Sequence, residues 1–406
     1  MSDMKELMLC EVGDIVTGST PSTSVAEYWN GQVPFYSPSD FDGAVFSTDT
    51  EKTVTDLGAS TGRKLIVGSV MVTCIGSIGK MAICNKDGIS NQQINTIIPK
   101  PNFDSLYLYY LVLNGINRFI NLAPQTTIQI INKTEFGKFK FRFHEYETQK
   151  KIAKILSTVD SLIEKTQTLM DKYTAIKQGM MADLFTRGID MTTGDTPNSK
   201  AGKLRPSVED APEFYKQTEL GWVPKEWEVC SLSDCLEFLD SKRIPLKQED
   251  RANMQGHYRY FGASGVIDYV NDYIFDGEFI LLGEDGENVL SRNVPLAFKV
   301  KGKIWVNNHA HIMVPANSSN IDYFTEYLES LNYENLVSGS AQPKITQNQL
   351  AGMLVRVPTL VEQVAIAEKL YSLNKKIEAE TAYLEKLRVQ KKGLMQDLLT
   401  GKVKVQ

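Results

Sequence analysis

Two stretches of the chain read as copies of one long helix. Residues 149–186 read QKKIAKILSTVDSLIEKTQTLMDKYTAIKQGMMADLFT, and residues 363–400 read QVAIAEKLYSLNKKIEAETAYLEKLRVQKKGLMQDLLT. They align without a gap, so that Gln149 matches Gln363 and Leu184 matches Leu398. A duplicated long helix indicates a molecule built from two halves. Such a molecule suits a two-fold target or two copies of a partner.

Each copy carries an apolar seam with spacings that alternate between four and three residues, which is typical of a coiled coil. Polar residues at two shared positions, Thr166 with Glu380 and Lys177 with Lys391, interrupt the seam and are expected to fix register or orientation. Each helix would be roughly 60 Å long. Because so polar a helix is marginal in isolation, the two seams are expected to pack on each other. The predicted seam residues are Ile152, Leu156, Val159, Ile163, Met170, Tyr173, Met180 and Leu184, and Ile366, Leu370, Leu373, Ile377, Leu384, Leu387, Leu394 and Leu398.

The bulk composition is that of a globular protein with more than one domain. The 406 residues include 42% hydrophobic and 23% charged residues. No apolar run reaches the roughly 18 residues that span a bilayer, and the first residues lack a signal-peptide pattern. The five scattered cysteines suit reduced thiols. We therefore expect a cytoplasmic protein without a membrane segment.

The net charge of −5 counts against binding to nucleic acid through bulk positive charge. If DNA is the partner, local basic stretches or another subunit must attract the phosphates.

Five segments follow one another along the chain. The helix copies occupy 146–187 and 359–406, two mixed segments with β-branched runs and turn residues occupy 1–145 and 218–358, and 188–217 is a polar linker. One further helix is predicted at 104–120. The mixed segments are duplicated more faintly, and the matched ranges are 68–73 with 277–282, 91–95 with 307–311, 103–114 with 321–332, and 139–143 with 353–357.

Several motifs suggest catalysis without supporting it. Residues 76–80, GSIGK, have two residues between the glycines where a phosphate-binding loop needs four, so a strand-to-strand turn is favoured. His309 and His311 lack a third metal ligand at a sensible spacing, which favours an ordinary polar pair. Cys230 and Cys235 have no later partner pair and are interpreted as structural thiols.

Residues 284–288, EDGEN, are the remaining candidate for chemistry. A metal-dependent nuclease would need a lysine or further acids converging on them. A turn that reads base edges is as plausible, and a plain turn is more so. Because the sequence contains no cofactor loop and no methyltransferase motif, we expect the chain to do no chemistry itself.

Polar and aromatic residues at strand ends and turns recur at corresponding places in both mixed segments. Asn, Gln, Ser and Thr can pair with base edges, and Lys with phosphate or guanine. The DNA-binding candidates are Tyr36, Ser37, Ser39, Asn91, Gln92, Gln93, Thr126, Thr127, Gln129 and Lys133 in the first segment, and Tyr260, Ser264, Asn288, Asn307, Asn308, His309, Gln342 and Lys344 in the second.

These features together resemble the DNA-specificity (S) subunit of Type I restriction–modification systems. The resemblance covers nearly the whole chain. Its most specific parts are the helix ends and the linker end, and it also includes short stretches of the second mixed segment. The stretches are 177–186 (KQGMMADLFT), 391–400 (KKGLMQDLLT), 219–227 (ELGWVPKEW), 260–265 (YFGASG), 309–311 (HAH) and 342–344 (QPK).

The resemblance implies a pseudo-two-fold α/β (α+β) fold. Two target-recognition domains would each read one half of a gapped, asymmetric DNA sequence. The helices would form an antiparallel coiled coil that sets the spacer and docks two adenine-methyltransferase subunits, which bind S-adenosylmethionine and flip the target base. Two restriction subunits, using ATP and Mg²⁺, would complete the complex. No cofactor or metal is expected in this chain.

Two other functions are compatible with the residues. One is a single-chain metal-dependent nuclease built on residues 284–288. The other is a structural coiled-coil adaptor whose mixed segments do not bind DNA, which the negative net charge would suit.

Overall fold

The computed structural model describes residues 4–122, 130–192, 202–316, 319–337 and 343–405. The chain divides into two compact units: unit 1 comprises Met1–Thr168 and Thr381–Gln406, and unit 2 comprises Leu169–Glu380. The long helices α6 (Tyr146–Leu184) and α12 (Leu360–Leu399) each contribute one part to either unit. The helices are therefore not a domain of their own, and each unit is built on one part of both.

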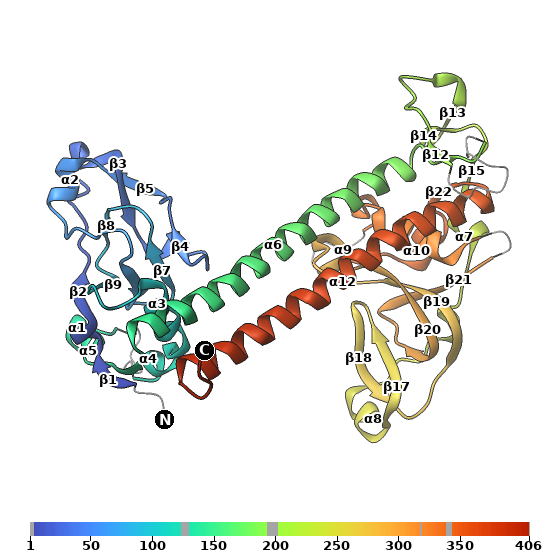
Figure 1. The fold of residues 1–406 in the computed structure, drawn as a ribbon. Coiled ribbons are helices and arrows are strands. Elements are labelled where there is room, and N and C mark those ends of the chain that lie inside the picture. The colour runs from blue at the N-terminus through green and yellow to red at the C-terminus, as the bar shows by residue number, and fades with distance from the viewer. Residues whose placement is uncertain (1–3, 123–129, 193–201, 317–318, 338–342, 406) are drawn as a thin grey trace. The chain divides into compact units, whose positions relative to one another are not determined.

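Unit 1 contains a five-stranded sheet of order β2-β9-β6-β7-β4 and a three-stranded sheet of order β5-β3-β8 (Figure 1). A further antiparallel pair joins β1 to β10, and β10 directly precedes α6 in the sequence. Besides α6 and α12, its elements are β1 (Lys5–Met8), α1 (Leu9–Val12), β2 (Gly13–Thr17), η1 (Ala26–Tyr28), β3 (Trp29–Tyr36), η2 (Pro38–Asp40), β4 (Phe46–Ser47), β5 (Lys52–Val54), α2 (Asp56–Ser60), β6 (Val70–Thr73), β7 (Met81–Cys84), β8 (Ile89–Ser90), β9 (Ile94–Pro99), α3 (Ser105–Asn114), α4 (Ile116–Leu122), α5 (Lys133–Gly137) and β10 (Lys140–Phe143).

The single helix predicted at 104–120 is wrong, because the structure has two helices there. Asp104 caps the first turn of α3 by accepting a hydrogen bond from the backbone of Tyr107 (2.8 Å). At Gly115 the chain leaves helical geometry, and the ring of Phe141 packs so closely that a Cβ atom there would lie 2.5 Å from it. Glycine is therefore required where α3 ends and α4 begins.

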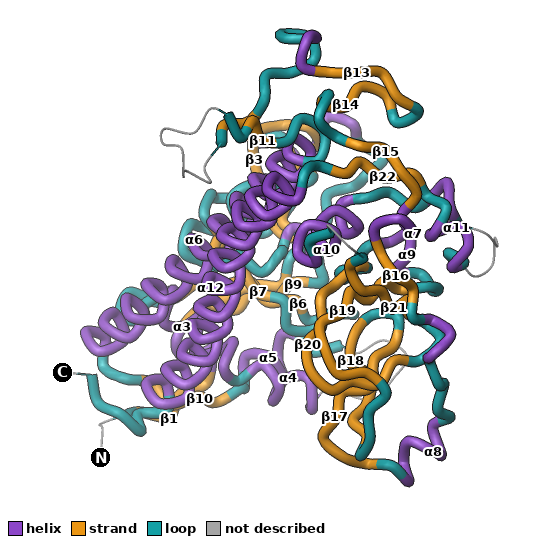
Figure 2. The backbone as a smooth tube through the Cα atoms, turned by 90° about the vertical axis from the view of Figure 1, so that its right-hand side faces the viewer, coloured by secondary structure: helices purple, strands orange, loops and turns teal. Residues whose placement is uncertain are grey.

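Unit 2 contains a six-stranded sheet of order β16-β21-β19-β20-β17-β18, together with the pair β15 and β22 (Figure 2). Besides α6 and α12, its elements are β11 (Ile189–Asp190), β12 (Lys203–Leu204), η3 (Pro212–Phe214), β13 (Tyr215–Thr218), β14 (Gly221–Pro224), β15 (Glu228–Ser231), α7 (Leu232–Cys235), β16 (Leu236–Phe238), η4 (Asp240–Lys242), α8 (Gln248–Asn253), β17 (Gln255–Gly262), β18 (Gly265–Val270), β19 (Phe275–Gly283), α9 (Asn288–Ser291), β20 (Ala297–Val306), β21 (Ala310–Pro315), α10 (Ile321–Ser330), η5 (Glu334–Leu336), α11 (Gln347–Ala351) and β22 (Leu354–Val357).

The long helices pack into the core of each unit in opposite directions. In unit 1, Ile152 and Leu156 near the start of α6 share a core with Leu398 near the end of α12. In unit 2, Leu184 at the end of α6 shares a core with Ile366 near the start of α12. Every predicted seam residue is buried or partly buried. The helices thus run antiparallel, and their apolar faces are covered within each unit.

A glutamine at the start of each long helix ties it to the mixed segment in the same way. Gln149 accepts a hydrogen bond from the backbone of Asp104 (3.0 Å), and Gln363 accepts one from the backbone of Asn320 (2.8 Å). Each of these partners is the N-cap of a helix, α3 or α10. The two units are therefore repeats in their internal contacts as well as in sequence.

The structure corrects two of the faint sequence alignments. The N-caps match Asp104 with Asn320, so pairing 103–114 with 321–332 is wrong by two residues. In the sheets, Val70 pairs with Ile97 and Ile280 with Met313, so pairing 68–73 with 277–282 is wrong by one residue. Apolar runs without strict alternation do not define their own register.

The segment predicted as a linker, 188–217, has structure where it is described. Arg205, which follows β12, forms a buried bidentate ion pair with Glu362 on α12 (2.5 and 3.1 Å). The same carboxylate accepts hydrogen bonds from the indole of Trp227 (2.9 Å) and the backbone of Ile189 (2.7 Å). One glutamate therefore fastens this segment to the start of α12.

None of the described helices has an apolar stretch long enough to cross a membrane.

Candidate functional site

In unit 1, four chain segments meet at the ends of the parallel strands β3 and β8. The backbone N–H of Asn91 donates to the carbonyl of Tyr36 (3.0 Å), which joins the two strand ends. The N–H of Cys74 donates to Gln93 (2.7 Å), and the N–H of Ile131 donates to Cys74 (2.9 Å). We call this meeting point the first junction.

Unit 2 builds the same junction at the ends of its parallel strands β17 and β20. The N–H of Asn307 donates to the carbonyl of Phe261 (3.0 Å), the N–H of Glu284 to His309 (2.9 Å), and the N–H of Ile345 to Glu284 (2.8 Å). Three backbone hydrogen bonds thus recur at equivalent places. We call this meeting point the second junction.

An asparagine shapes the turn in both junctions. The side-chain oxygen of Asn91 accepts from the backbone of Gln93 (3.0 Å), and that of Asn307 accepts from the backbone of His309 (2.7 Å). Asparagine is favoured here because its side chain can hydrogen-bond its own backbone two residues on. The turn is therefore the same, while the residue it presents differs: glutamine in one unit and histidine in the other.

A single antiparallel bridge closes each junction. It joins Ile75 to Ile130 in unit 1 and Asp285 to Lys344 in unit 2. The two bridge residues are thus apolar in the first junction and charged in the second. A common backbone with different exposed side chains is what two recognition surfaces on one scaffold require.

The structure places two of the predicted DNA-contacting aromatics in the core. Tyr36 is fully buried and its hydroxyl donates to the carbonyl of Lys86 (2.8 Å), and burial raises its pKa. Tyr260 is 1% exposed and its hydroxyl accepts from the backbone of Leu246 (3.0 Å). Both rings are therefore part of the core and do not face solvent.

The other first-segment candidates lie at or beside the first junction. Ser37 is partly buried and donates to Asp40 (2.6 Å), whereas Ser39 is exposed. Gln92 is exposed and accepts from the Thr20 hydroxyl (2.6 Å), and exposed Lys133 begins α5, two residues after the junction. Thr126, Thr127 and Gln129, like Gln342 of the second segment, lie outside the described residues.

In the second segment the candidates divide between exposed and structural positions. Asn308, His309 and Lys344 are exposed at the second junction, and Ser264 is exposed in the turn after β17. Asn307 is 5% exposed and holds its turn. The side chain of Asn288 both donates to and accepts from the backbone of Val294 (3.0 Å each), which closes a loop.

The predicted pairing of His309 with His311 is not one site, because the two side chains have different surroundings. His309 lies in the turn before β21 and contacts Asp285 (Nδ1 to Oδ2, 2.8 Å). His311 is fully buried within β21. The sequence GSIGK at 76–80 forms the turn between the antiparallel strands β6 and β7, as predicted, with Gly76 and Gly79 at positive φ.

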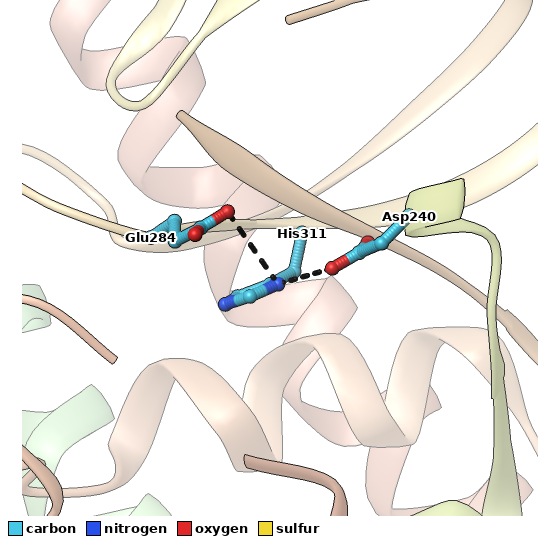
Figure 3. Close-up of side chains that lie close together, drawn as sticks. All are labelled: Asp240, Glu284 and His311. Carbon is cyan, nitrogen blue, oxygen red and sulfur yellow. Dashed lines mark hydrogen bonds and ion pairs between the residues drawn. The ribbon is translucent and has the colours of Figure 1, made fainter. Parts of the chain in front are cut away.

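A buried cluster of Asp240, Glu284 and His311 lies beneath the second junction (Figure 3). Nδ1 of His311 is 2.5 Å from a carboxylate oxygen of Asp240, and its Nε2 is 2.9 Å from the carbonyl of Ile345. Both ring nitrogens therefore already face oxygen atoms of the protein. A metal ligand must instead offer a free nitrogen lone pair.

Basic side chains already balance the acids of this cluster. Arg243 contacts Glu284 (2.8 Å) and Asp240 (3.2 Å), and Lys344 contacts the other oxygen of Glu284 (3.0 Å). Burial alone would raise the pKa of Glu284, but the hydrogen bonds from Arg243 and Lys344 outweigh burial and hold that pKa below its ordinary value. The residues present thus do not fit a metal ion, although their ligand atoms lie within 4.8 Å of one another.

In unit 1, neutral side chains occupy the equivalent places. Asn95 stands where unit 2 has His311, and it donates to the carbonyl of Ile131 (3.2 Å). Its oxygen accepts from the hydroxyl of Thr17 (2.6 Å), and Cys74 stands where unit 2 has Glu284. Because a neutral hydrogen-bond network holds the first junction, we interpret the charged cluster as a structural support for the second junction. Asp240 and Arg243 are not predicted from the sequence, because they lie far from residues 307–311 along the chain.

Comparison with known proteins agrees with this two-unit architecture. The sequence profile of the type I restriction modification DNA specificity domain matches residues 1–172 and 224–388. This match over both units identifies a DNA-specificity protein with two target-recognition domains. The chain belongs to the family of type I restriction modification DNA specificity domains, and it is the non-catalytic specificity subunit of such a system.

Curated relatives and solved structures span nearly the whole chain. The MjaVIII specificity subunit of Methanocaldococcus jannaschii is 26% identical over 97% of this chain and 92% of its own length. The EcoprrI specificity subunit of Escherichia coli is 23% identical over 90% of this chain and 86% of its own length. The crystal structure of the S subunit from M. genitalium matches with a TM-score of 0.63 at 17% identity, covering 98% of this chain and 96% of that one.

Proposed function

We propose that this specificity subunit binds a bipartite, gapped and asymmetric DNA sequence and positions two adenine-methyltransferase subunits on it, together with restriction subunits where these are present. The observation that carries the proposal is the repeated junction. Two units share one hydrogen-bonded backbone there but differ in the exposed side chains, so each unit would read its own half of the target.

The exposed and partly exposed groups of the junctions suit direct readout of base edges. Exposed Gln92 and partly exposed Gln93 can pair with adenine, and Lys344 can donate to guanine or to a phosphate. The contact between Asp285 and Nδ1 of His309 fixes the orientation of the imidazole ring. The negative net charge means that phosphate attraction must come from local lysines or from the partner subunits.

We propose that the helices shared by the units determine the spacer and dock the partners. Half-sites one helical turn apart on DNA lie about 34–36 Å from each other. Lys, Glu and Gln on the polar faces of α6 and α12 would bind the methyltransferase subunits. S-adenosylmethionine, ATP and Mg²⁺ would belong to those partners. A solved structure from work on complex assembly of the type I restriction–modification system matches this chain with a TM-score of 0.54 at 12% identity, which supports the shared fold alone.

The test is co-expression of the chain with its methyltransferase subunit, followed by mapping of methylated adenines. The proposal expects one gapped motif with a modified adenine in each half. Scattered methylation by an active complex would favour the adaptor function instead. Cleavage by the purified chain with Mg²⁺, abolished by a chelator, would favour the nuclease, which the charge-balanced cluster beneath the second junction does not support.

A further inference from the structure

In unit 1, a lysine of the helix pair meets a carboxylate where the helices contact the mixed segment. Nζ of Lys391 on α12 is 2.6 Å from Asp160 on α6, and the two side chains are 22% and 19% exposed. The other oxygen of Asp160 accepts a hydrogen bond from the hydroxyl of Tyr110 on α3 (2.6 Å). Figure 1 shows α3 beside the start of α6. The carboxylate here belongs to the helix pair, and the neutral donor belongs to the mixed segment.

Unit 2 also has a lysine, a carboxylate and a neutral donor in contact, but its carboxylate and its neutral donor have exchanged places. Nζ of Lys177 on α6 is 2.9 Å from Glu326 on α10, with side chains 22% and 17% exposed. The other oxygen of Glu326 accepts from the side-chain amide of Asn374 on α12 (2.7 Å). In this unit the carboxylate belongs to the mixed segment, and the neutral donor belongs to the helix pair.

The two arrangements occupy equivalent positions. The helix repeat matches Lys177 with Lys391 and Asp160 with Asn374. The N-caps of α3 and α10, Asp104 and Asn320, are each six residues before the third member, which is Tyr110 or Glu326. Each unit thus holds one lysine, one carboxylate and one neutral donor, but the carboxylate has changed sides.

We propose that this exchange is a matching device between a mixed segment and the helices that carry it. The first segment, with Tyr110, requires an acid at the position of Asp160. The second segment, with Glu326, requires a neutral donor at the position of Asn374. The inference goes beyond the proposed function, because it concerns which segments assemble with which helices and is tested without DNA.

The device has a consequence for the exchange of recognition segments. Moving the first segment to the second position would leave Lys177 without a carboxylate at this contact. Moving the second segment to the first position would put two carboxylates, those of Asp160 and Glu326, beside one lysine. A partly buried charge without a partner, or two like charges together, destabilises a contact. Segments are therefore interchangeable only between positions that carry the complementary group.

Two nearly isosteric substitutions in the full-length chain test the device. Glu326→Gln removes the carboxylate, and Asn374→Asp adds one to the opposite side of the same hydrogen bond. Each single variant is expected to lower the thermal midpoint by about 3 °C or more. The double variant recreates the charge arrangement of unit 1 and is expected to recover most of that loss. Glu385→Gln, in the exposed pair of Glu385 with Arg388 on α12, is the control and should change the midpoint by less than about 1 °C.

Coupling of opposite sign is the decisive result. If Asn374→Asp lowers the midpoint in the native chain and raises it in the Glu326→Gln chain, the matching device is supported. If the losses of the two single variants add in the double variant, the proposal is overturned.

A chimaera tests the consequence for segment exchange. A chain with residues 218–358 in place of 1–145 is expected to give little folded protein, and Asp160→Asn is expected to raise the folded yield several-fold. An equal yield with and without Asp160→Asn contradicts the proposed role in exchange.

Discussion

Replacing His309 with alanine is expected to relax recognition at one half of the target only. Its imidazole is 48% exposed and, within the described part of the chain, its hydrogen bonds involve Nδ1 and Asp285. The turn depends on the backbone of His309, whose N–H donates to Asn307 and whose carbonyl accepts from Glu284. The substitution therefore removes the side chain proposed to contact DNA and keeps the junction.

The expected loss of base discrimination follows from the one base contact that His309→Ala would remove. A well-placed base contact contributes about 1–3 kcal/mol of discrimination, which is roughly 5- to 150-fold. The change in unfolding free energy should stay within about 0.5 kcal/mol, since the side chain is half exposed.

The assay is methylation of a target library, randomised at one position at a time, by the complex of the variant with its methyltransferase. His309→Ala should relax one or two positions in one half and leave the other half unchanged. Gln93→Ala, at the equivalent place in unit 1, should relax the opposite half. The control is His257→Ala, because His257 is exposed at the other end of β17. Equal weakening of both halves by His309→Ala, or the same effect from His257→Ala, would refute the reasoning.

Three further predictions concern the unfolding and reactivity of the chain alone. The pKa of Glu284 is lowered in the folded state, so its stabilisation is present above the ordinary pKa and is lost as the pH falls through the lowered one. Glu284→Gln should flatten the fall of the unfolding free energy below about pH 5 in denaturant titrations, and an unchanged profile would contradict this. Glu362→Ala breaks the buried pair with Arg205 and should cost about 3–5 kcal/mol in denaturant unfolding, whereas a cost below about 1 kcal/mol would show that the pair does not hold the segment. Iodoacetamide near neutral pH should label exposed Cys10 well before Cys74, because burial raises the pKa of the Cys74 thiol to about 11; mass spectrometry showing equal labelling would exclude the described burial.

The long helices could be predicted closely from the sequence, because their period repeats over many turns and two copies support one another. Structure gives Tyr146–Leu184 and Leu360–Leu399 within the predicted ranges 146–187 and 359–406. The lysines predicted to fix register, Lys177 and Lys391, prove to be ion-paired. A heptad pattern does not show which carboxylate pairs with each lysine. The partner of Lys177, Glu326, belongs to another segment of the chain.

The junctions were predictable only in part. Asn91 and Asn307 are predictable because residues 91–95 align with residues 307–311. The sequence pattern predicts Tyr36 and Tyr260 as exposed aromatics at strand ends and turns, yet both are buried. The direction of a side chain on a strand depends on which face of the sheet is covered. Asp240 gave no local signal, because its partner His311 is distant in sequence.

The most direct test of the central claim is exchange of residues 1–145 for the corresponding segment of a related subunit that carries a neutral donor at the place of Tyr110. Methylated adenines are then mapped in the complex of the exchanged chain with the original methyltransferase. If each unit reads its own half, one half of the motif changes to that of the donor, while the other half and the spacer stay the same. A motif that changes in both halves, or in neither, would contradict independent reading by two units.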